Sequence, residues 1–164
     1  MSNRGDVLAL LRENARYTNE DIARQTGLTE SDVEAIIDEL EDEGVIKGYT
    51  AVVDWEAVEE GDEAVRATVE LNVTLDRETS YTDISDRISK FPQVRSLRLI
   101  SGDYDFDMEV EGDSMSEVSH FISDKIAPIP EITQTVTHYI MTTYKEQGIE
   151  FGDGPDDDRL SVSP

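Results

Sequence analysis

The chain has 164 residues and carries 38 acidic residues against 14 basic ones, which gives a net charge of −24. Cysteine is absent, and this excludes disulfides, thiol nucleophiles and cysteine metal sites. No apolar run reaches the roughly 18 residues of a membrane span, and the first residues do not have the regions of a signal peptide, so we expect a cytoplasmic protein with no membrane partner.

The acidic residues are spread along the whole chain and are not gathered in one arm. Such a surface repels itself in dilute buffer. At about 1 M salt the Debye length falls to about 3 Å, so the repulsion is screened while the surface stays hydrated. We therefore interpret the composition as an adaptation to the salt-rich cytoplasm of a halophile; the alternative is an acidic protein from an ordinary cell.

The first 54 residues predict three helices followed by two short extended pieces. Apolar residues recur at helical spacing within 4–14, 19–26 and 30–43. Thr29 and Asp32 have the spacing of a capping box at the start of the third helix, and Gly44 is positioned to end it. Residues 45–54 then indicate two extended pieces that turn at Lys47 and Gly48, which is typical of the wing in a winged helix-turn-helix.

The second half predicts a sheet domain, because the apolar period changes from 3.6 to 2 at residue 65. The expected elements are a strand at 65–75, a helix at 80–91, strands at 94–101 and 105–112, a helix at 114–126 and a strand at 132–144. This βαββαβ order is that of a ferredoxin-like unit, an antiparallel sheet with both helices on one face. Tyr81 and Met115 are among the helix residues expected to be buried. We expect the uncovered face of the sheet to pair with a second copy, giving a homo-oligomer.

These elements divide the chain into four parts. We expect a winged helix-turn-helix domain at 1–54, an acidic linker at 55–64, a sheet domain at 65–147 and a disordered acidic tail at 148–164.

The element order and two stretches, NARYTNEDIARQTGLTESDVEAIIDELEDEGVIKGYTAVVD and SGDYDFDMEV, resemble the leucine-responsive regulator family, Lrp/AsnC. With the acidic composition, the chain resembles a haloarchaeal member of it. The resemblance covers about residues 4–145 and implies an α+β fold with an N-terminal winged helix-turn-helix and a C-terminal ferredoxin-like βαββαβ domain called RAM. It implies a ligand-responsive transcriptional regulator of amino acid or nitrogen metabolism, not an enzyme. Such regulators form dimers or larger rings, bind double-stranded DNA and sense amino acids between RAM domains.

The third helix corresponds to the one that lies in the DNA major groove. Between Glu30 and Glu43 it has eight carboxylates and no basic residue, whereas the family's corresponding helix usually carries Arg or Lys. Three interpretations remain open: cations bridge carboxylates and phosphates at high salt, the helix contacts a protein partner, or it is a solvated face without a binding role. The candidate DNA-contacting residues are Thr18, Arg24, Thr29, Glu30, Ser31, Glu34 and Lys47, with Arg16 as a further candidate for a phosphate contact.

The loop SGDYD is the candidate effector site. Gly102 permits a positive φ that turns N–H groups toward a carboxylate, and Asp103 or Asp105 can hold an ammonium group. A free amino acid presents both charges, although a simple β-turn also explains the spacing. The resemblance favours the effector site and adds two threonines of the last strand. The candidate effector-binding residues are Ser101, Gly102, Asp103, Tyr104, Asp105, Thr135 and Thr137.

We expect neither a metal nor a cofactor. Asp103, Asp105 and Asp107 have the spacing of a calcium loop, but Met108 and Ser114 stand where that loop needs Gly and Glu.

Two alternatives to a DNA-binding regulator remain: an amino-acid-sensing scaffold that acts through protein partners, and an enzyme similar to the sirohaem decarboxylases, which resemble the family in both halves. A chain of charge −24 is a poor host for their large acidic tetrapyrrole.

Overall fold

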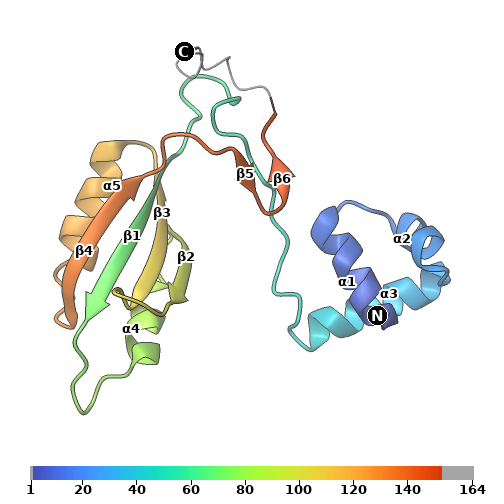
Figure 1. The fold of residues 1–164 in the computed structure, drawn as a ribbon, viewed down its shortest axis with the longest axis horizontal. Helices are drawn as coiled ribbons and strands as arrows, with labels where there is room; N and C mark the ends of the chain where they lie inside the picture. Colours follow the sequence, from blue (N-terminus) through green and yellow to red (C-terminus); the bar gives the residue numbers. More distant parts are fainter. Residues whose placement is uncertain (1, 153–164) are drawn as a thin grey trace, which may run out of the picture. The chain divides into compact units, whose positions relative to one another are not determined.

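The computed structural model describes residues 2–152, which divide into two compact units (Figure 1). The first unit contains residues 2–53 and a hairpin at 145–150, and the second contains residues 54–144 with 151–152. Within the described residues, no helix combines the length and the apolar character that a membrane crossing requires.

The first unit contains the three predicted helices, α1 (Asn3–Glu13), α2 (Asn19–Thr26) and α3 (Glu30–Asp42). Each helix contributes to one small core, whose buried members are Val7, Leu11, Ile22, Ala23 and Val33. Gly27 and Gly44, with φ of +76° and +69°, end α2 and α3 in the left-handed region, which side chains with a Cβ atom rarely adopt. The predicted ends of α2 and α3 are therefore confirmed, and both helices end because a glycine follows in the left-handed conformation.

The segment after α3 differs from the predicted wing. Residues 45–54 contain no paired strand, so the two extended pieces predicted to turn at Lys47 and Gly48 do not pair with each other. The Val45 and Ile46 N–H groups both donate to the Leu40 carbonyl oxygen, at 2.9 and 3.0 Å. These bonds hold the start of the segment against the last turn of α3. The N–H groups of the segment thus bond to a carbonyl group at the end of the helix and not to a second strand.

The second unit has the predicted βαββαβ order. Its elements are β1 (Val65–Val73), α4 (Tyr81–Ile88), β2 (Val94–Leu99), β3 (Phe106–Gly112), α5 (Met115–Phe121) and β4 (Ile132–Tyr139). The four strands form one antiparallel sheet in the order β2-β3-β1-β4, so β1 and β3 are central and β2 and β4 are the edges (Figure 1).

Both helices cover the same face of this sheet, as predicted. Alternate residues of β1, namely Ala67, Val69 and Leu71, are fully buried, and they belong to one core with residues of α4 and α5. Burying an apolar side chain of this size contributes about 1.5–3 kcal/mol, so the alternation in β1 determines which face the helices cover. The other face of the sheet has no covering helix among the described elements.

Two residues predicted to be buried in these helices are exposed. Met115 is 55% exposed and Tyr81 is 38% exposed, and each is the first residue of its helix. The Tyr81 ring nevertheless packs edge-on against the ring of Phe106 in β3, with centroids 5.9 Å apart. The helix predicted at 114–126 is also not uniform: after Phe121 it continues as a π-helical turn, Ile122–Ile126. This wider turn keeps Ile122 and Ile126 in the core.

A small hairpin, β5 (Lys145–Glu146) and β6 (Ile149–Glu150), was not predicted. Its turn has positive φ at Gln147 and Gly148, +49° and +81°, as a two-residue hairpin turn requires. The strand β6 lies inside the segment expected to be a tail, 148–164, so regular structure extends further than predicted. The rest of that segment, 153–164, lies outside the described residues.

Candidate nucleic-acid interface and effector site

The candidate DNA-reading helix α3 begins with a complete capping box. Thr29 Oγ1 accepts the Asp32 N–H at 3.1 Å, and the Asp32 carboxylate accepts the Thr29 N–H at 3.2 Å. Hydrogen bonds from the Thr29 hydroxyl and N–H hold the pKa of Asp32 below its ordinary value. Thr18 and Asp21 make the same arrangement at the start of α2. The two threonines predicted to contact DNA therefore already have a structural role as helix caps.

The other predicted residues at the start of α3 lie on its exposed side. Glu30, Ser31 and Glu34 are all exposed, and neither glutamate has an ion pair within residues 2–152. The structure thus brings these three side chains together on the N-terminal part of the helix. Their surface is anionic, so it suits contact with phosphates only if cations are present.

Carboxylates at the other end of α3 have partners within the unit. Arg4 of α1 donates to both carboxylate oxygens of Glu43 and lies 4.0 Å from Glu39, and the hydrogen bond from Arg4 lowers the pKa of Glu43. The Tyr49 hydroxyl donates to Glu41 at 2.7 Å, and this contact raises the pKa of Tyr49 to about 12. These carboxylates stabilise the unit, whereas Glu30 and Glu34 near the start of α3 have no ion pair within residues 2–152 and lie open to an external partner.

The predicted phosphate-contacting cations differ in availability. Arg24 donates to Asp21 at 2.7 Å, three residues earlier on α2, although its side chain is still 69% exposed. Arg16 and Lys47 are exposed and have no ion pair within the described part of the chain. The residues of the first unit, 1–53 and 145–150, include six basic residues against fourteen acidic ones, so the unit remains strongly anionic.

The candidate effector loop joins β2 to β3 at the edge of the sheet. Gly102 has φ of +114°, a conformation that favours glycine, and no neighbour would meet a Cβ atom there. Ser101, Gly102 and Asp103 are exposed, while Tyr104 and Asp105 are half-buried. The loop therefore presents a carboxylate and open backbone to solvent.

Asp105 is bound into the sheet by three hydrogen bonds. Its N–H donates to the Leu71 carbonyl oxygen, its carbonyl oxygen accepts the Ile100 N–H, and its Oδ2 accepts the Val73 N–H, each at 2.9 Å. Asp105 thus joins the end of β1 to the loop. One carboxylate oxygen has this structural role, which the sequence pattern did not predict.

Thr135 and Thr137 do not lie beside this loop in one chain. Strand register sets Thr135 opposite Leu71 and Thr137 opposite Val69, so β1 lies between β4 and the strand that carries the loop. Neighbouring strands are about 4.8 Å apart, so two strand spacings separate the threonines from β3. The structure brings Ser101, Gly102, Asp103, Tyr104 and Asp105 together but leaves the two threonines apart from them.

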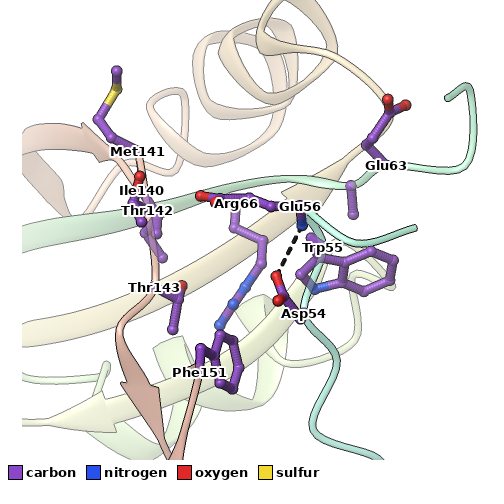
Figure 2. Close-up of a pocket in the computed structure, with 11 residues that line it drawn as sticks. Asp54, Trp55, Glu56, Glu63, Arg66, Ile140, Met141, Thr142, Thr143 and Phe151 are labelled. Atoms are coloured by element: carbon purple, nitrogen blue, oxygen red, sulfur yellow. Dashed lines mark hydrogen bonds between the residues drawn. The ribbon is translucent and has the colours of Figure 1, made fainter. Parts of the chain in front are cut away.

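A recess of about 400 Å³ lies near the start of β1, the end away from the loop (Figure 2). Trp55 and Asp54 flank one side of it, and Thr143 and Phe151 flank the other, with Arg66 between them. Its volume is within the range of small-molecule sites. The recess is thus a second place in this unit where a small ligand has room.

The Arg66 side chain in this recess is only 10% exposed, and it donates from Nε and one terminal nitrogen to Glu109, at 3.0 and 2.7 Å. A buried guanidinium needs such a partner, because removing one member of the pair leaves an uncompensated charge. The pair joins β1 to β3 and gives Arg66 a structural role.

The sequence pattern assigned two residues of the recess to irregular segments. Trp55 was expected in the linker 55–64 and Phe151 in the tail 148–164, yet both are half-buried. Exposing a large aromatic side chain to water is unfavourable, so Trp55 and Phe151 in polar segments each indicate that their segment packs against the unit. Periodicity alone does not detect this signal. No group of three or more acidic or histidine side chains in residues 2–152 is arranged to hold a metal ion.

The fold and the two candidate sites define a protein with a helix-turn-helix unit and a separate ligand-binding unit. Residues 2–47 match the family model for winged helix-turn-helix DNA-binding, and residues 66–149 match the model for the Lrp/AsnC ligand binding domain. The chain belongs to the Lrp/AsnC family.

Relatives and solved structures agree with this assignment. The uncharacterized HTH-type transcriptional regulator YugG of Bacillus subtilis is 40% identical over 159 residues, which cover 97% of this chain and 95% of YugG. The transcriptional regulator AzlB of the same organism is 31% identical over 140 residues, covering 85% and 87%. The fold is similar to that of the regulator NMB0573 of Neisseria meningitidis, solved as an L-Met complex, with a TM-score of 0.68, 22% identity and coverage of 89% and 92%.

Proposed function

We propose that this protein is a transcriptional regulator that binds operator DNA through α3 at high salt and responds to an amino acid bound by its sheet domain. The observation that carries the proposal is that one chain combines a helix-turn-helix with an Lrp/AsnC ligand-binding domain. Both helices of the helix-turn-helix, α2 and α3, begin with a capping box. The similarity to YugG and AzlB, both named transcriptional regulators, supports it.

High salt is part of the proposal because the exposed start of α3 has no cation of its own. In an ordinary complex, Lys and Arg release counterions from DNA, and binding weakens steeply as salt rises. Here Glu30 and Glu34 would instead hold cations that bridge to phosphates. Binding then takes up cations and stays constant or strengthens with salt.

Fluorescence anisotropy with the protein's own upstream DNA, from about 0.2 to about 3 M KCl, tests this mechanism. We expect binding that persists or improves across the range. A steep loss of affinity with salt would contradict cation bridging and favour direct contacts by Arg16 and Lys47. If no genomic fragment binds in concentrated KCl while the protein stays folded, DNA binding itself is ruled out.

A matched pair of variants separates a role of α3 from the effect of total charge. The double variant Glu30→Gln with Glu34→Gln removes two charges from the proposed cation sites, and we expect it to change the salt dependence. Glu78→Gln with Asp86→Asn removes the same charge from the second unit, and we expect it to leave the salt dependence unchanged. Equal effects of both pairs would mean that the carboxylates act only through net charge.

A second candidate function is an amino-acid-sensing scaffold that binds protein partners and not DNA. The eight carboxylates between Glu30 and Glu43 favour it, because a basic protein surface is a better match for them than phosphate in the absence of cations. The anisotropy measurement decides between the two functions.

The uncovered face of the sheet supports a homo-oligomer formed through this face. It carries the ion pairs Arg66–Glu109, Arg95–Glu111 and Arg98–Asp107, and the contact between His138 and Glu70 at 3.1 Å. With the histidine neutral, three arginines against four carboxylates leave a net charge of −1, whereas the whole chain has −24. Two copies would therefore repel each other far less here than at the rest of their surfaces.

Light scattering tests this contact with a variant on the uncovered face. Val136 of β4 is opposite Glu70, so Val136→Asp adds a charge to that face, and we expect a shift toward monomer. Thr82→Asp, on an exposed position of α4, is the control with the same added charge, and it should keep the oligomer intact.

A further inference from the structure

The recess near the start of β1 has two aromatic side chains in its wall, Trp55 and Phe151 (Figure 2). Trp55 is the only tryptophan of the chain. Both side chains are half-buried, yet neither is among the residues that form the core of the sheet domain or pack against that core. Their burial therefore comes from the walls of the recess, and both rings line a space of about 400 Å³.

Short hydrogen bonds hold the segments that carry these two rings. Trp55 lies in a turn in which the Glu56 N–H donates to the Asp54 carboxylate at 3.1 Å. On the other side, the Phe151 N–H donates to the Tyr144 carbonyl oxygen at 3.0 Å. All of these residues belong to the second unit, so the recess is formed within one compact body. A site whose walls are already in place loses less entropy when a ligand binds.

The charges around the recess favour a cation. Three of its lining residues are exposed carboxylates, Asp54, Glu56 and Glu63. Arg66 is the one cation among the described residues that line it, and its guanidinium lies 2.7 Å from the Glu109 carboxylate, which offsets its charge. Four carboxylates against one guanidinium leave a net charge of −3, so the recess repels an anionic ligand.

We propose that the recess binds an organic cation with a methylated ammonium group, which contacts the rings of Trp55 and Phe151 and the carboxylate of Asp54. The face of an aromatic ring carries partial negative charge and attracts a cation within about 6 Å of the ring centre. Tryptophan makes the strongest contact of this kind, and quaternary ammonium ligands are recognised in this way. The site lies at the other end of β1 from the loop Ser101–Asp105 and does not depend on the proposed amino-acid response.

The aromatic wall distinguishes this ligand from potassium and from a primary ammonium group. In about 2 M KCl, charges that are not in contact are screened, and K⁺ competes for every carboxylate. A primary ammonium group has three N–H donors that lose their hydration against a ring. Methyl groups on the nitrogen remove these donors and add apolar surface that the rings cover, so electrostatic attraction and hydrophobic contact act together.

Fluorescence of the full chain in about 2 M KCl tests the proposal, because Trp55 is the only tryptophan and its emission reports on the recess. The probes are choline, ethanolamine with its primary ammonium group, and the neutral analogue of choline in which a carbon atom replaces the nitrogen. We expect choline to change the emission saturably and to bind roughly tenfold more tightly than the other two probes.

Two pairs of variants, compared by isothermal titration with choline, locate the contact. Trp55→Leu keeps an apolar side chain without the ring and should weaken binding roughly tenfold. Tyr81→Leu removes a ring that is 38% exposed and does not line the recess, and it should leave binding unchanged. Asp54→Asn keeps an oxygen for the Glu56 N–H and removes the charge, so it should weaken binding several-fold, whereas Asp86→Asn on α4 should not. Circular dichroism checks that the variants stay folded.

Each other outcome would overturn the proposal. Equal binding of choline and its carbon analogue would mean that the recess does not recognise charge, and tighter binding of ethanolamine would mean that the rings do not select the ligand. Equal choline binding by Trp55→Leu and Tyr81→Leu would place the contact outside the recess. If Trp55→Leu changes the oligomer size in light scattering but not choline binding, the recess is a contact between copies. Absence of binding by all three probes to the folded protein would exclude a site for such cations.

Discussion

Replacing Asp105 separates its two roles, the structural bond to Val73 and the proposed contact with an effector. Asp105→Ala removes both, and it leaves the Val73 N–H without the acceptor that lies at 2.9 Å. Asp105→Asn keeps a side-chain oxygen of the same size at the same place and removes only the charge. The two variants should therefore differ in stability and agree in effector response.

The expected loss for Asp105→Ala follows from this bond. A hydrogen bond to a charged group contributes about 1.5–3 kcal/mol, and half-burial of Asp105 favours the lower end, about 1.5–2 kcal/mol. A domain of roughly 60–100 residues changes its Tm by about 4–8 °C per kcal/mol. Asp105→Ala should thus lower the Tm by about 5–15 °C, and Asp105→Asn by clearly less.

Thermal unfolding in about 2 M KCl, with and without an amino acid that binds, measures both quantities. We expect the effector-dependent rise in Tm to disappear in both variants and to persist in the control Asp86→Asn, which removes an exposed carboxylate of α4. An Asp105→Ala protein as stable as the parent would refute the structural role of this bond. A full ligand shift in Asp105→Asn would refute the contact between this carboxylate and the effector, and its loss in Thr143→Val would move the effector to the recess.

Three further predictions concern stability. Glu109→Gln neutralises the carboxylate that the buried Arg66 guanidinium contacts at 2.7 Å and should cost about 1.5–3 kcal/mol in chemical unfolding, whereas Glu111→Gln, whose pair spans 3.9 Å, should cost less than about 1 kcal/mol; similar losses would contradict the importance of burial. Ile84→Ala empties a fully buried position of the second unit's core and should cost about 2–5 kcal/mol, and a loss below that range would mean that the helix collapses onto the sheet. The pKa of Asp32 is lower in the folded protein than its ordinary value of about 4, so the ionised carboxylate stabilises the folded state above that pH. This stabilisation is lost as the pH falls through the lower folded-state pKa. Asp32→Asn, which does not titrate, should therefore lose less stability than the parent between about pH 5 and pH 2, measured by urea unfolding at each pH.

Features that depend on neighbouring residues in the chain could be predicted from the sequence. The capping box of Thr29 and Asp32, the helix end at Gly44 and the positive φ of Gly102 each follow from the chemistry of one short segment. The strict alternation in β1 predicted the face that the helices cover, because side chains of a strand point alternately to its two sides. These are the parts of the fold that the structure confirms.

Features that depend on residues far apart in the chain were missed. The bond from Asp105 to Val73, the pairing of Arg66 with Glu109, and the separation of Thr135 from the loop all follow from strand order and register. The sequence contains no local signal for which strands become neighbours, since β1 pairs with β3 and β4 across long stretches of chain.

The sequence by itself determined the helices of the first unit, the βαββαβ order of the second and the acidic character of α3, because these depend on local periodicity, capping and charge. Tertiary structure alone decided which carboxylates of α3 are engaged by Arg4 and Tyr49, and that Trp55 and Phe151 line one recess. The physical reason is that burial and ion pairing are properties of distant segments brought together, and their free energy appears only once the chain has folded.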